Sequence, residues 1–239
     1  MTGRISRAIN WLALGLNRRG RVLDLGSGNA PHPRADVLCD RYLQPTGHRR
    51  GAKLVEDRPL VCADIAALPF PAGAFSFLIC RMLVEHLSAT DLAGALREMM
   101  RVACGGYIEA PSPVCELLMP DPHHAMFVEL AGSKLIFTPK SDRFPEPAVA
   151  ACLLGWRRNL PAWRGFMMDH DGLFTTRFEW TGSIPYEIRP PASYPESLAP
   201  APTELEAMWA RAEPADRTRS ARQIAKATAR TLFKLPVLR

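Results

Sequence analysis

The run Val22-Leu23-Asp24-Leu25 leads directly into the turn Gly26-Ser27-Gly28, and this junction constrains the fold more than any other feature. A short apolar run closed by glycines predicts a buried parallel strand. Because glycine has no side chain to block a ligand, such a turn also allows close approach to the backbone. We therefore expect a parallel sheet with a ligand at the end of this strand.

Further strand candidates alternate with a helical pattern in the first half of the chain. Apolar runs predict four more strands, at 35–40, 60–64, 75–80 and 107–110. Before the last of these, Thr90-Asp91 caps a helix that ends at Gly105-Gly106. Strands and helices in this alternation predict an α/β domain with helices on both faces of the sheet.

The second half of the chain follows a different pattern. Residues 125–140 fit either a hairpin or a helix followed by a strand, and residues 147–159 look helical. The runs 173–180 and 184–188, separated by Thr181-Gly182-Ser183, predict an antiparallel hairpin.

Three regions are expected. Residues 1–19 form an N-terminal helix that packs on the core. Residues 20–190 form the main domain, with an insert or lid at about 114–165. Residues 191–239 form a proline-rich connection and basic helices, the last at roughly 216–234.

Composition favours a soluble cytoplasmic protein. Of the 239 residues, 47% are hydrophobic and 23% are charged. No apolar run approaches the roughly 18–20 residues that cross a bilayer, and the apolar stretch near the N-terminus lacks a signal-peptide cleavage site. The 6 cysteines are scattered singly, which favours free thiols in a reducing compartment. The net charge of +6 has a local excess in residues 215–239.

The details of the glycine turn separate two classes of nucleotide site. A dinucleotide-binding turn has a third glycine three residues after the second, whereas this chain has Pro31 at that place. Asp24 lies two residues before the first glycine, and a carboxylate there suits a ligand with a cationic amino-acid end. The turn therefore disfavours a nicotinamide-dependent oxidoreductase.

Four segments resemble, in order, the class I S-adenosylmethionine-dependent methyltransferases of the small-molecule, type 11-like group. They are VLDLGSGNA, CADIAALPF, FSFLICRMLVEHL and REMMRVACGGYIEAPSP, within about residues 20–113. The resemblance implies a Rossmann-like, doubly wound, seven-stranded sheet with helices on both faces. Its strands would be mostly parallel, and the hairpin at 173–188 would supply the antiparallel C-terminal strands.

The resemblance also implies a set of cofactor contacts. The residues that would bind S-adenosylmethionine are Asp24, Gly26, Ser27, Gly28, Asp40, Asp64, Ile65 and Arg81. Asp40 would hydrogen-bond the ribose hydroxyls, Asp64 the adenine amino group, and Ile65 would pack on the adenine ring. Arg81 would line the cofactor pocket or form a surface salt bridge. The chain departs from the family in its short, proline-bearing first crossover and in Ser76, where the family often has aspartate.

Three histidines are candidate catalytic bases. His86 follows Glu85 and either faces the substrate or belongs to a helix cap. His123 and His124 lie together in a loop, where one would accept a proton from the substrate or both would simply be solvated. With Asp121 they would supply metal ligands, but no second cluster accompanies them, so no metal is expected.

Methyl transfer from a sulfonium requires mainly that the nucleophile be aligned, so no conspicuous catalytic triad is needed. The expected acceptor is a small molecule, a glycan or a lipid precursor. Nucleic acid is not expected, because Cys80-Arg81-Met82-Leu83 replaces the signature that base-modifying amino-methyltransferases carry after the fourth strand.

Two alternatives to a methyltransferase stay open at this point, and so does contact with a membrane. A non-catalytic binding module of the same fold is the main alternative, and a nicotinamide-dependent oxidoreductase is the second. The basic, one-sided apolar pattern of residues 216–234 fits either peripheral contact with an anionic membrane or docking on the core.

Overall fold

The computed structural model describes residues 20–46, 49, 51–118, 121, 123–141 and 171–191. The helices expected within 1–19, 147–159 and 191–239, and the proline-rich connection, lie outside the described residues. None of the helices in the described part is long and apolar enough to cross a membrane.

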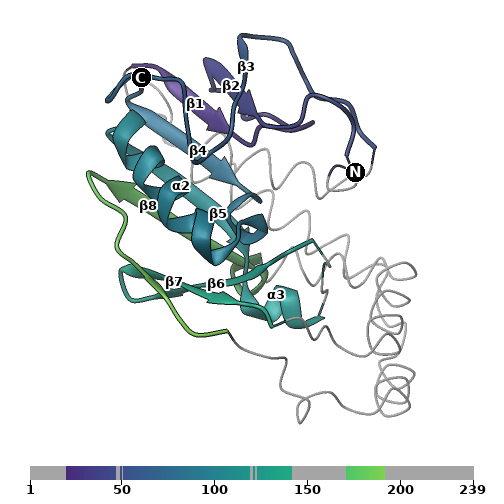
Figure 1. The fold of residues 1–239 in the computed structure, drawn as a ribbon, viewed down its shortest axis with the longest axis vertical. Helices are drawn as coiled ribbons and strands as arrows, with labels where there is room; N and C mark the ends of the chain where they lie inside the picture. Colours follow the sequence, from purple (N-terminus) through teal and green to yellow (C-terminus); the bar gives the residue numbers. More distant parts are fainter. Residues whose placement is uncertain are drawn as a thin grey trace, which may run out of the picture.

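In the described part of the chain, the larger sheet has six strands in the order β3-β2-β1-β4-β5-β8 (Figure 1). Its strands are β1 (Val22–Leu25), β2 (Val37–Asp40), β3 (Leu60–Cys62), β4 (Phe77–Arg81), β5 (Gly105–Pro111) and β8 (Thr175–Thr181). The first five are mutually parallel, and β8 is antiparallel to β5. The mostly parallel α/β sheet predicted from the sequence is therefore confirmed.

The strand order reverses direction at β1, which has β2 on one side and β4 on the other. In open α/β sheets ligands bind beyond the carboxyl ends of the strands at such a switch point. The glycine turn that follows Leu25 lies at this point.

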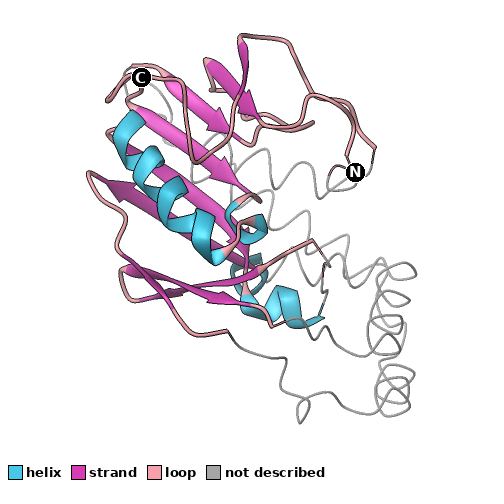
Figure 2. Ribbon diagram, in the orientation of Figure 1, coloured by secondary structure: helices cyan, strands magenta, loops and turns pink. Residues whose placement is uncertain are grey.

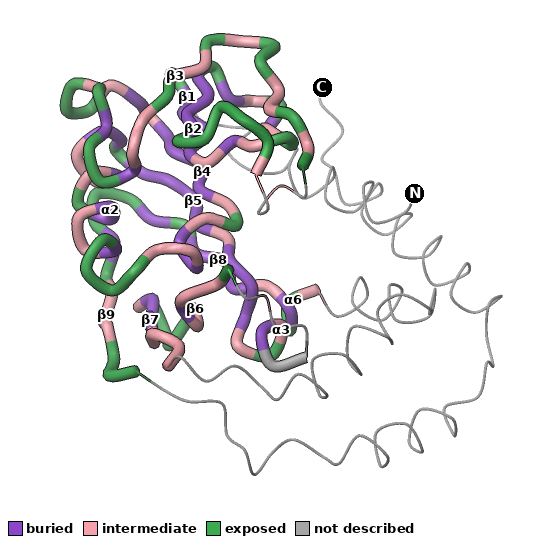
Figure 3. The backbone as a smooth tube through the Cα atoms, turned by 45° about the vertical axis from the view of Figure 1, so that its right-hand side comes forward, coloured by how far each residue is buried: buried purple, intermediate pink, exposed green. Residues whose placement is uncertain are grey.

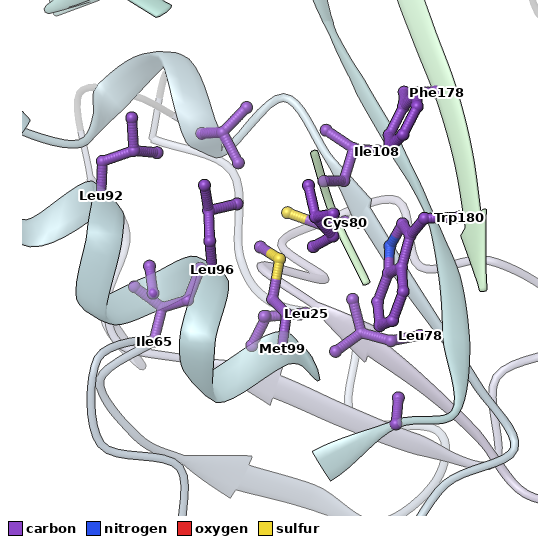
Figure 4. Close-up of a cluster of buried hydrophobic side chains, with 14 of the residues drawn as sticks. Leu25, Ile65, Leu78, Cys80, Leu92, Leu96, Met99, Ile108, Phe178 and Trp180 are labelled. Atoms are coloured by element: carbon purple, nitrogen blue, oxygen red, sulfur yellow. The ribbon is translucent and has the colours of Figure 1, made fainter. Parts of the chain in front are cut away.

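Helix α2 (Ala89–Val102) covers one face of the sheet (Figure 2). The helix is capped by Ser88, two residues before the predicted Thr90, and the Ser88 side chain accepts a hydrogen bond from the Asp91 N–H at 3.2 Å. Five residues of the helix are buried, namely Leu92, Ala95, Leu96, Met99 and Val102. Figure 4 shows this apolar stripe against side chains of β1, β4, β5 and β8.

The opposite face of the sheet carries a smaller buried cluster of Val22, Phe77, Ile79 and Tyr107. Figure 3 shows how burial concentrates in the central strands. The other helices of the described part are short, namely η1 (Val84–His86), α3 (Pro113–Leu118) and α6 (Asp171–Phe174). The expectation of helices on both faces is therefore confirmed only for the face that α2 covers.

A second sheet of three strands has the order β6-β7-β9. Strands β6 (Met126–Ala131) and β7 (Lys134–Pro139) form an antiparallel hairpin, which decides between the two alternatives for residues 125–140. Strand β9 (Tyr186–Ile188) pairs with β7 in parallel.

The predicted hairpin at 173–188 is wrong, because its two runs belong to different sheets, and within the described residues the larger sheet has six strands. Strand β8 pairs along its whole length with β5, but after the turn at Gly182 the chain crosses to the second sheet. There the Leu135 N–H donates to the Pro185 carbonyl and the Arg189 N–H to the Phe137 carbonyl. Bonds to β7 thus replace those that a hairpin would have made with β8, because the β6-β7 hairpin offers an open edge.

Candidate functional site

The turn after β1 adopts a conformation that requires glycine. Gly26 has φ +72, and a Cβ added to it would lie 2.8 Å from the Leu83 Cδ2 atom. The Gly26 and Ser27 N–H groups both donate to the Cys39 carbonyl of β2, at 2.8 and 3.2 Å. The predicted close turn is thus present, fixed between β2 and the segment after β4.

Asp24 is almost fully buried, with 2% of its surface exposed. Its carboxylate accepts a hydrogen bond from the His32 N–H. Burial raises the pKa of Asp24 to about 6, although the bond from His32 and the charges of Arg81 and Arg58 act in the opposite direction. A cation that approached this carboxylate would stabilise its ionised form.

Ser27 contributes an unused polar atom to the same turn. Its Oγ is buried and has no hydrogen-bond partner in the described part of the chain. A buried hydroxyl without a partner is unfavourable, so a ligand that offers a donor or acceptor there would be stabilised. Sequence reasoning placed Ser27 in the site, but only the structure shows this unsatisfied atom.

Asp40, at the end of β2, connects the glycine turn to the following loop. Its carboxylate accepts from the Gly28 N–H at 3.0 Å and from the Tyr42 N–H at 2.9 Å. The Arg49 guanidinium adds an ion pair at 3.3 Å. Asp40 therefore orders the loop beside the turn, and its contact with a ribose stays a prediction.

Asp64 and Ile65 follow β3 and have different surroundings. Asp64 is partly exposed, accepts from the Ala66 N–H at 2.9 Å and pairs with Arg41 at 3.0 Å. Ile65 is buried in the apolar core against α2, as Figure 4 shows. The adenine contacts expected of these two residues stay predictions.

Arg81 ends β4 and reaches the glycine turn. Its Nη2 atom donates to the Ala30 carbonyl at 3.0 Å, and its charge lowers the pKa of Asp24. The next residue, Met82, has φ +50 and is 40% exposed. Among described residues other than glycine it is the one with positive φ, a strain that often accompanies functional sites.

A second group of polar side chains surrounds η1, and we name it the η1 cluster: Glu85, His86, Glu116, His124 and Lys140. Glu116 of α3 is 1% exposed, and its carboxylate pairs with the His124 Nδ1 atom and with the Lys140 ammonium. The rings of His86 and His124 meet edge to face, with centroids 4.6 Å apart. Segments next to strands of both sheets therefore meet in one polar group, in which Glu85 and Glu116 are buried.

Glu85 is the most deeply buried member of the η1 cluster. Its side chain is 0% exposed, and neither carboxylate oxygen has a hydrogen-bond partner in the part of the chain that the structure describes. Burial raises the pKa of Glu85 to about 8, and the nearby Glu116 carboxylate adds to this rise.

The three candidate bases are thus separated by the structure. His86 and His124 lie together in the η1 cluster. The His123 ring pairs with Asp121 at 2.9 Å on a more exposed loop. The backbone carbonyl of His123 forms a hydrogen bond with the His86 Nδ1 atom at 2.9 Å. Sequence reasoning missed Glu116 and Lys140. A single acid inside the otherwise apolar stretch Pro113–Leu118 was the available signal for Glu116.

The η1 cluster lies close to the glycine turn. Leu83, which contacts Gly26, is two residues before Glu85. The buried thiol of Cys80 has its pKa raised first by burial and then by the charges of Glu85 and Asp24. One candidate site with two parts, a glycine turn and a polar cluster, therefore occupies the carboxyl ends of β1, β4 and β5.

Comparisons with known proteins show what the chain is similar to. Residues 37–108 match the family described as methyltransferase domain. A curated relative, malonyl-(acyl-carrier protein) O-methyltransferase of Halorhodospira halophila (strain DSM 244 / SL1), is 35% identical over 94 residues. That match covers 34% of this chain and 30% of the relative, so the chain spans less than a third of the relative it matches.

Two solved structures are more distant. The PH0226 protein of Pyrococcus horikoshii OT3 is 17% identical, covering 64% of this chain and 80% of that one with a TM-score of 0.39. A S-adenosylmethionine-dependent methyltransferase of Clostridium acetobutylicum ATCC 824 is 15% identical, covering 61% and 63% with a TM-score of 0.37.

The family match supports the resemblance to methyltransferases over residues 37–108. The matched residues contain Asp40, Asp64, Ile65 and Arg81 and begin after the glycine turn.

Proposed function

We propose that this protein is a S-adenosylmethionine-dependent methyltransferase that acts on a small-molecule nucleophile. The observation that carries the proposal is the buried carboxyl group of Asp24 beside the glycine turn, at the switch point of a parallel sheet. The match of residues 37–108 to a methyltransferase domain supports it and disfavours an oxidoreductase.

The residues of the turn fit this cofactor. A cationic amino group would pair with Asp24, whose burial makes an opposite charge favourable. The unsatisfied Ser27 Oγ and the backbone at Gly26, which has no side chain and has φ +72, provide a close polar surface. Asp40, Asp64, Ile65 and Arg81 would bind the adenosine part. When bound, the cofactor supplies the methyl group and the leaving group.

The chain itself would align the acceptor and keep water away. We place the acceptor beside the η1 cluster, because Leu83 connects this cluster to the glycine turn. For the acceptor atom we propose an oxygen, as in the name of the Halorhodospira halophila relative. A free metabolite, a glycan and a lipid precursor are the acceptors to be screened.

Cofactor titration by calorimetry tests the proposal. The wild-type protein is expected to bind S-adenosylmethionine, and Asp24→Ala is expected to bind at least about tenfold more weakly, since a hydrogen bond to a charged group contributes about 1.5–3 kcal/mol. Asp57→Ala, which removes an exposed carboxylate, serves as the control. Absence of binding at millimolar cofactor would overturn the proposal, and equal binding by Asp24→Ala would show that the site is misplaced.

A labelled-methyl screen over metabolite, glycan and lipid extracts follows. Transfer to any acceptor distinguishes the enzyme from a binding module, which would retain cofactor affinity without transfer. Titration with NAD tests the oxidoreductase alternative, for which the missing third glycine predicts no binding.

We also propose a weak contact of the basic segment 216–234 with anionic membranes. The proposal rests on its sequence pattern, in which Arg222, Lys226, Arg230 and Lys234 flank an apolar row. Full-length protein is expected to sediment with anionic vesicles at low salt, and protein 1–214 is expected to stay in solution. Equal recovery of both proteins with the vesicles would contradict it.

A further inference from the structure

Three groups of the η1 cluster converge on one point. One potential ligand atom from each of Glu85, His86 and His124 lies within 4.8 Å of the other two. The first two residues belong to η1, and the third is held beside them because the Ala125 N–H donates to the Glu85 carbonyl at 2.7 Å. Small side-chain rotations would bring each of these three atoms to about 2 Å from a common metal ion, the distance that nitrogen and oxygen ligands adopt.

The Glu85 carboxylate requires a positive partner in order to be ionised. It is 0% exposed, and in the described residues neither of its oxygens receives a hydrogen bond. An ionised carboxylate buried in this way is strongly unfavourable, so it either holds a proton or faces a cation. The ammonium of Lys140 donates a hydrogen bond to Glu116, and its charge also favours the ionised form of Glu85.

Both imidazoles are oriented in the manner of metal ligands. The His124 Nδ1 atom bonds to the Glu116 carboxylate, and the His86 Nδ1 atom bonds to the His123 carbonyl at 2.9 Å. Histidines that bind metals through one nitrogen commonly donate the other N–H to a carboxylate or a backbone carbonyl. An imidazole with its proton on Nδ1 presents an unprotonated Nε2, the form that binds a cation.

The charge of the η1 cluster also favours a cation. Once Glu85 is ionised, and with neutral imidazoles, the two carboxylates and one ammonium of the cluster sum to a net charge of −1. Two histidine nitrogens and one carboxylate are a ligand set of Zn²⁺ and similar first-row ions, whereas Mg²⁺ and Ca²⁺ prefer oxygen ligands alone.

We propose that Glu85, His86 and His124 form a binding site for a divalent transition metal ion of the Zn²⁺ class. Glu116 and the carbonyl of His123 orient the two imidazoles, and Lys140 balances the charge of Glu116. His86 and His124, two of the three histidines considered as bases, would then serve as ligands. Three protein ligands leave a further coordination position, which suits an acceptor oxygen; this last role alone rests on the proposed methyl transfer.

Metal titration of the full chain tests the site. The protein is freed of metal with a chelator, and a Cys62→Ser/Cys104→Ser background removes the two thiols that are exposed among the described residues and could compete as ligands. Calorimetry with Zn²⁺, and the visible absorption of Co²⁺, are expected to show one ion per chain. Zn²⁺ is also expected to raise Tm, while Mg²⁺ at equal concentration is expected to leave it unchanged.

Matched variants distinguish this site from nonspecific binding. Glu85→Gln, His86→Ala and His124→Ala are each expected to weaken Zn²⁺ binding by more than about tenfold, and Glu116→Gln by about tenfold. His123→Ala is the control, because it retains the backbone carbonyl and removes only the neighbouring ring. Circular dichroism of each variant checks the fold. If an alanine variant does not fold, the test of the site rests on Glu85→Gln, whose side chain has the same shape as that of glutamate.

Three results would overturn the site: no stoichiometric Zn²⁺ binding, unchanged binding in Glu85→Gln, or equal losses in His123→Ala and His124→Ala. Zn²⁺ binding is expected to persist in Asp24→Asn. Failure of the cofactor proposal therefore leaves the metal result unaffected, and failure of metal binding leaves the cofactor titration interpretable.

Discussion

The carboxyl group of Asp24 lies where the folded protein disfavours its ionised form. Burial lifts its pKa from 3.8 to about 6, so between these pH values the folded state holds more protons than the unfolded state. Stability due to this group is therefore present at low pH and is lost as pH rises toward 6. At neutral pH the ionised carboxylate lowers the free energy of unfolding, as is common for a charged group whose role is to bind a ligand.

Asp24→Asn removes this cost and keeps an acceptor for the His32 N–H. The shift corresponds to about 3 kcal/mol, so the variant is expected to exceed the wild type in free energy of unfolding at pH 7.5 by up to about that amount, with no excess near pH 4. Its affinity for S-adenosylmethionine is expected to fall. Urea denaturation at both pH values measures the first effect. A variant less stable than wild type at pH 7.5 would refute it.

Gly26 tests the turn itself. Gly26→Ala places a Cβ at φ +72 and 2.8 Å from Leu83 Cδ2. The expected loss is about 1–3 kcal/mol in the free energy of unfolding, with weaker cofactor binding. Gly73→Ala is the matched control, because Gly73 has φ +66 but nothing within 4 Å of the added atom. Equal losses in both variants would mean that the contact with Leu83 has no energetic effect.

At the scale of elements, the position of β8 beside β5 depends on one glycine. A Cβ on Gly106 would lie 2.5 Å from the Leu78 carbonyl oxygen of β4 and 2.9 Å from the Trp180 ring of β8. A backbone carbonyl in a sheet cannot move aside without breaking the ladder. The small residue at this place therefore permits the strands on either side of β5 to pack as they do.

Gly106→Ala is expected to destabilise the protein by at least about 3 kcal/mol, toward the upper end for overpacking. Gly172→Ala, where an added Cβ meets nothing within 4 Å, should change stability little. Chemical denaturation followed by circular dichroism compares the two variants. A loss in Gly106→Ala no greater than in Gly172→Ala would contradict the packing argument.

At the scale of the whole molecule, a buried ion pair connects the two sheets. Lys140 follows β7 of the second sheet, and Glu116 lies in α3 just after β5 of the first. Their side chains are 6% and 1% exposed, so removing one charge leaves the other buried with fewer partners.

Lys140→Met is expected to lower the free energy of unfolding by about 3–5 kcal/mol, and Glu116→Gln in the same chain should restore part of it. Lys134→Met provides the comparison, because Lys134 pairs with Glu187 on the same sheet but both are over 40% exposed. That exposed pair should contribute less than about 1 kcal/mol. Similar losses in the two lysine variants would show that burial is not the deciding factor.

The sequence by itself determined the parallel strands up to β5, the glycine turn and the buried stripe of α2. These features depend on neighbours within one strand or a few helical turns, where apolar spacing and glycine conformations act locally. It also determined the resemblance to methyltransferases, which rests on motifs in order.

Only the tertiary structure decided the partner of β9 and the gathering of Glu85, His86, Glu116, His124 and Lys140. The run at 186–188 fits a hairpin with β8 or a strand beside β7 equally well, because edge pairing is chosen by non-local contacts. The members of the cluster come from segments far apart in the chain. The burial of Glu85 and Glu116 beside these partners, and not the spacing of the residues, gives the cluster its chemistry.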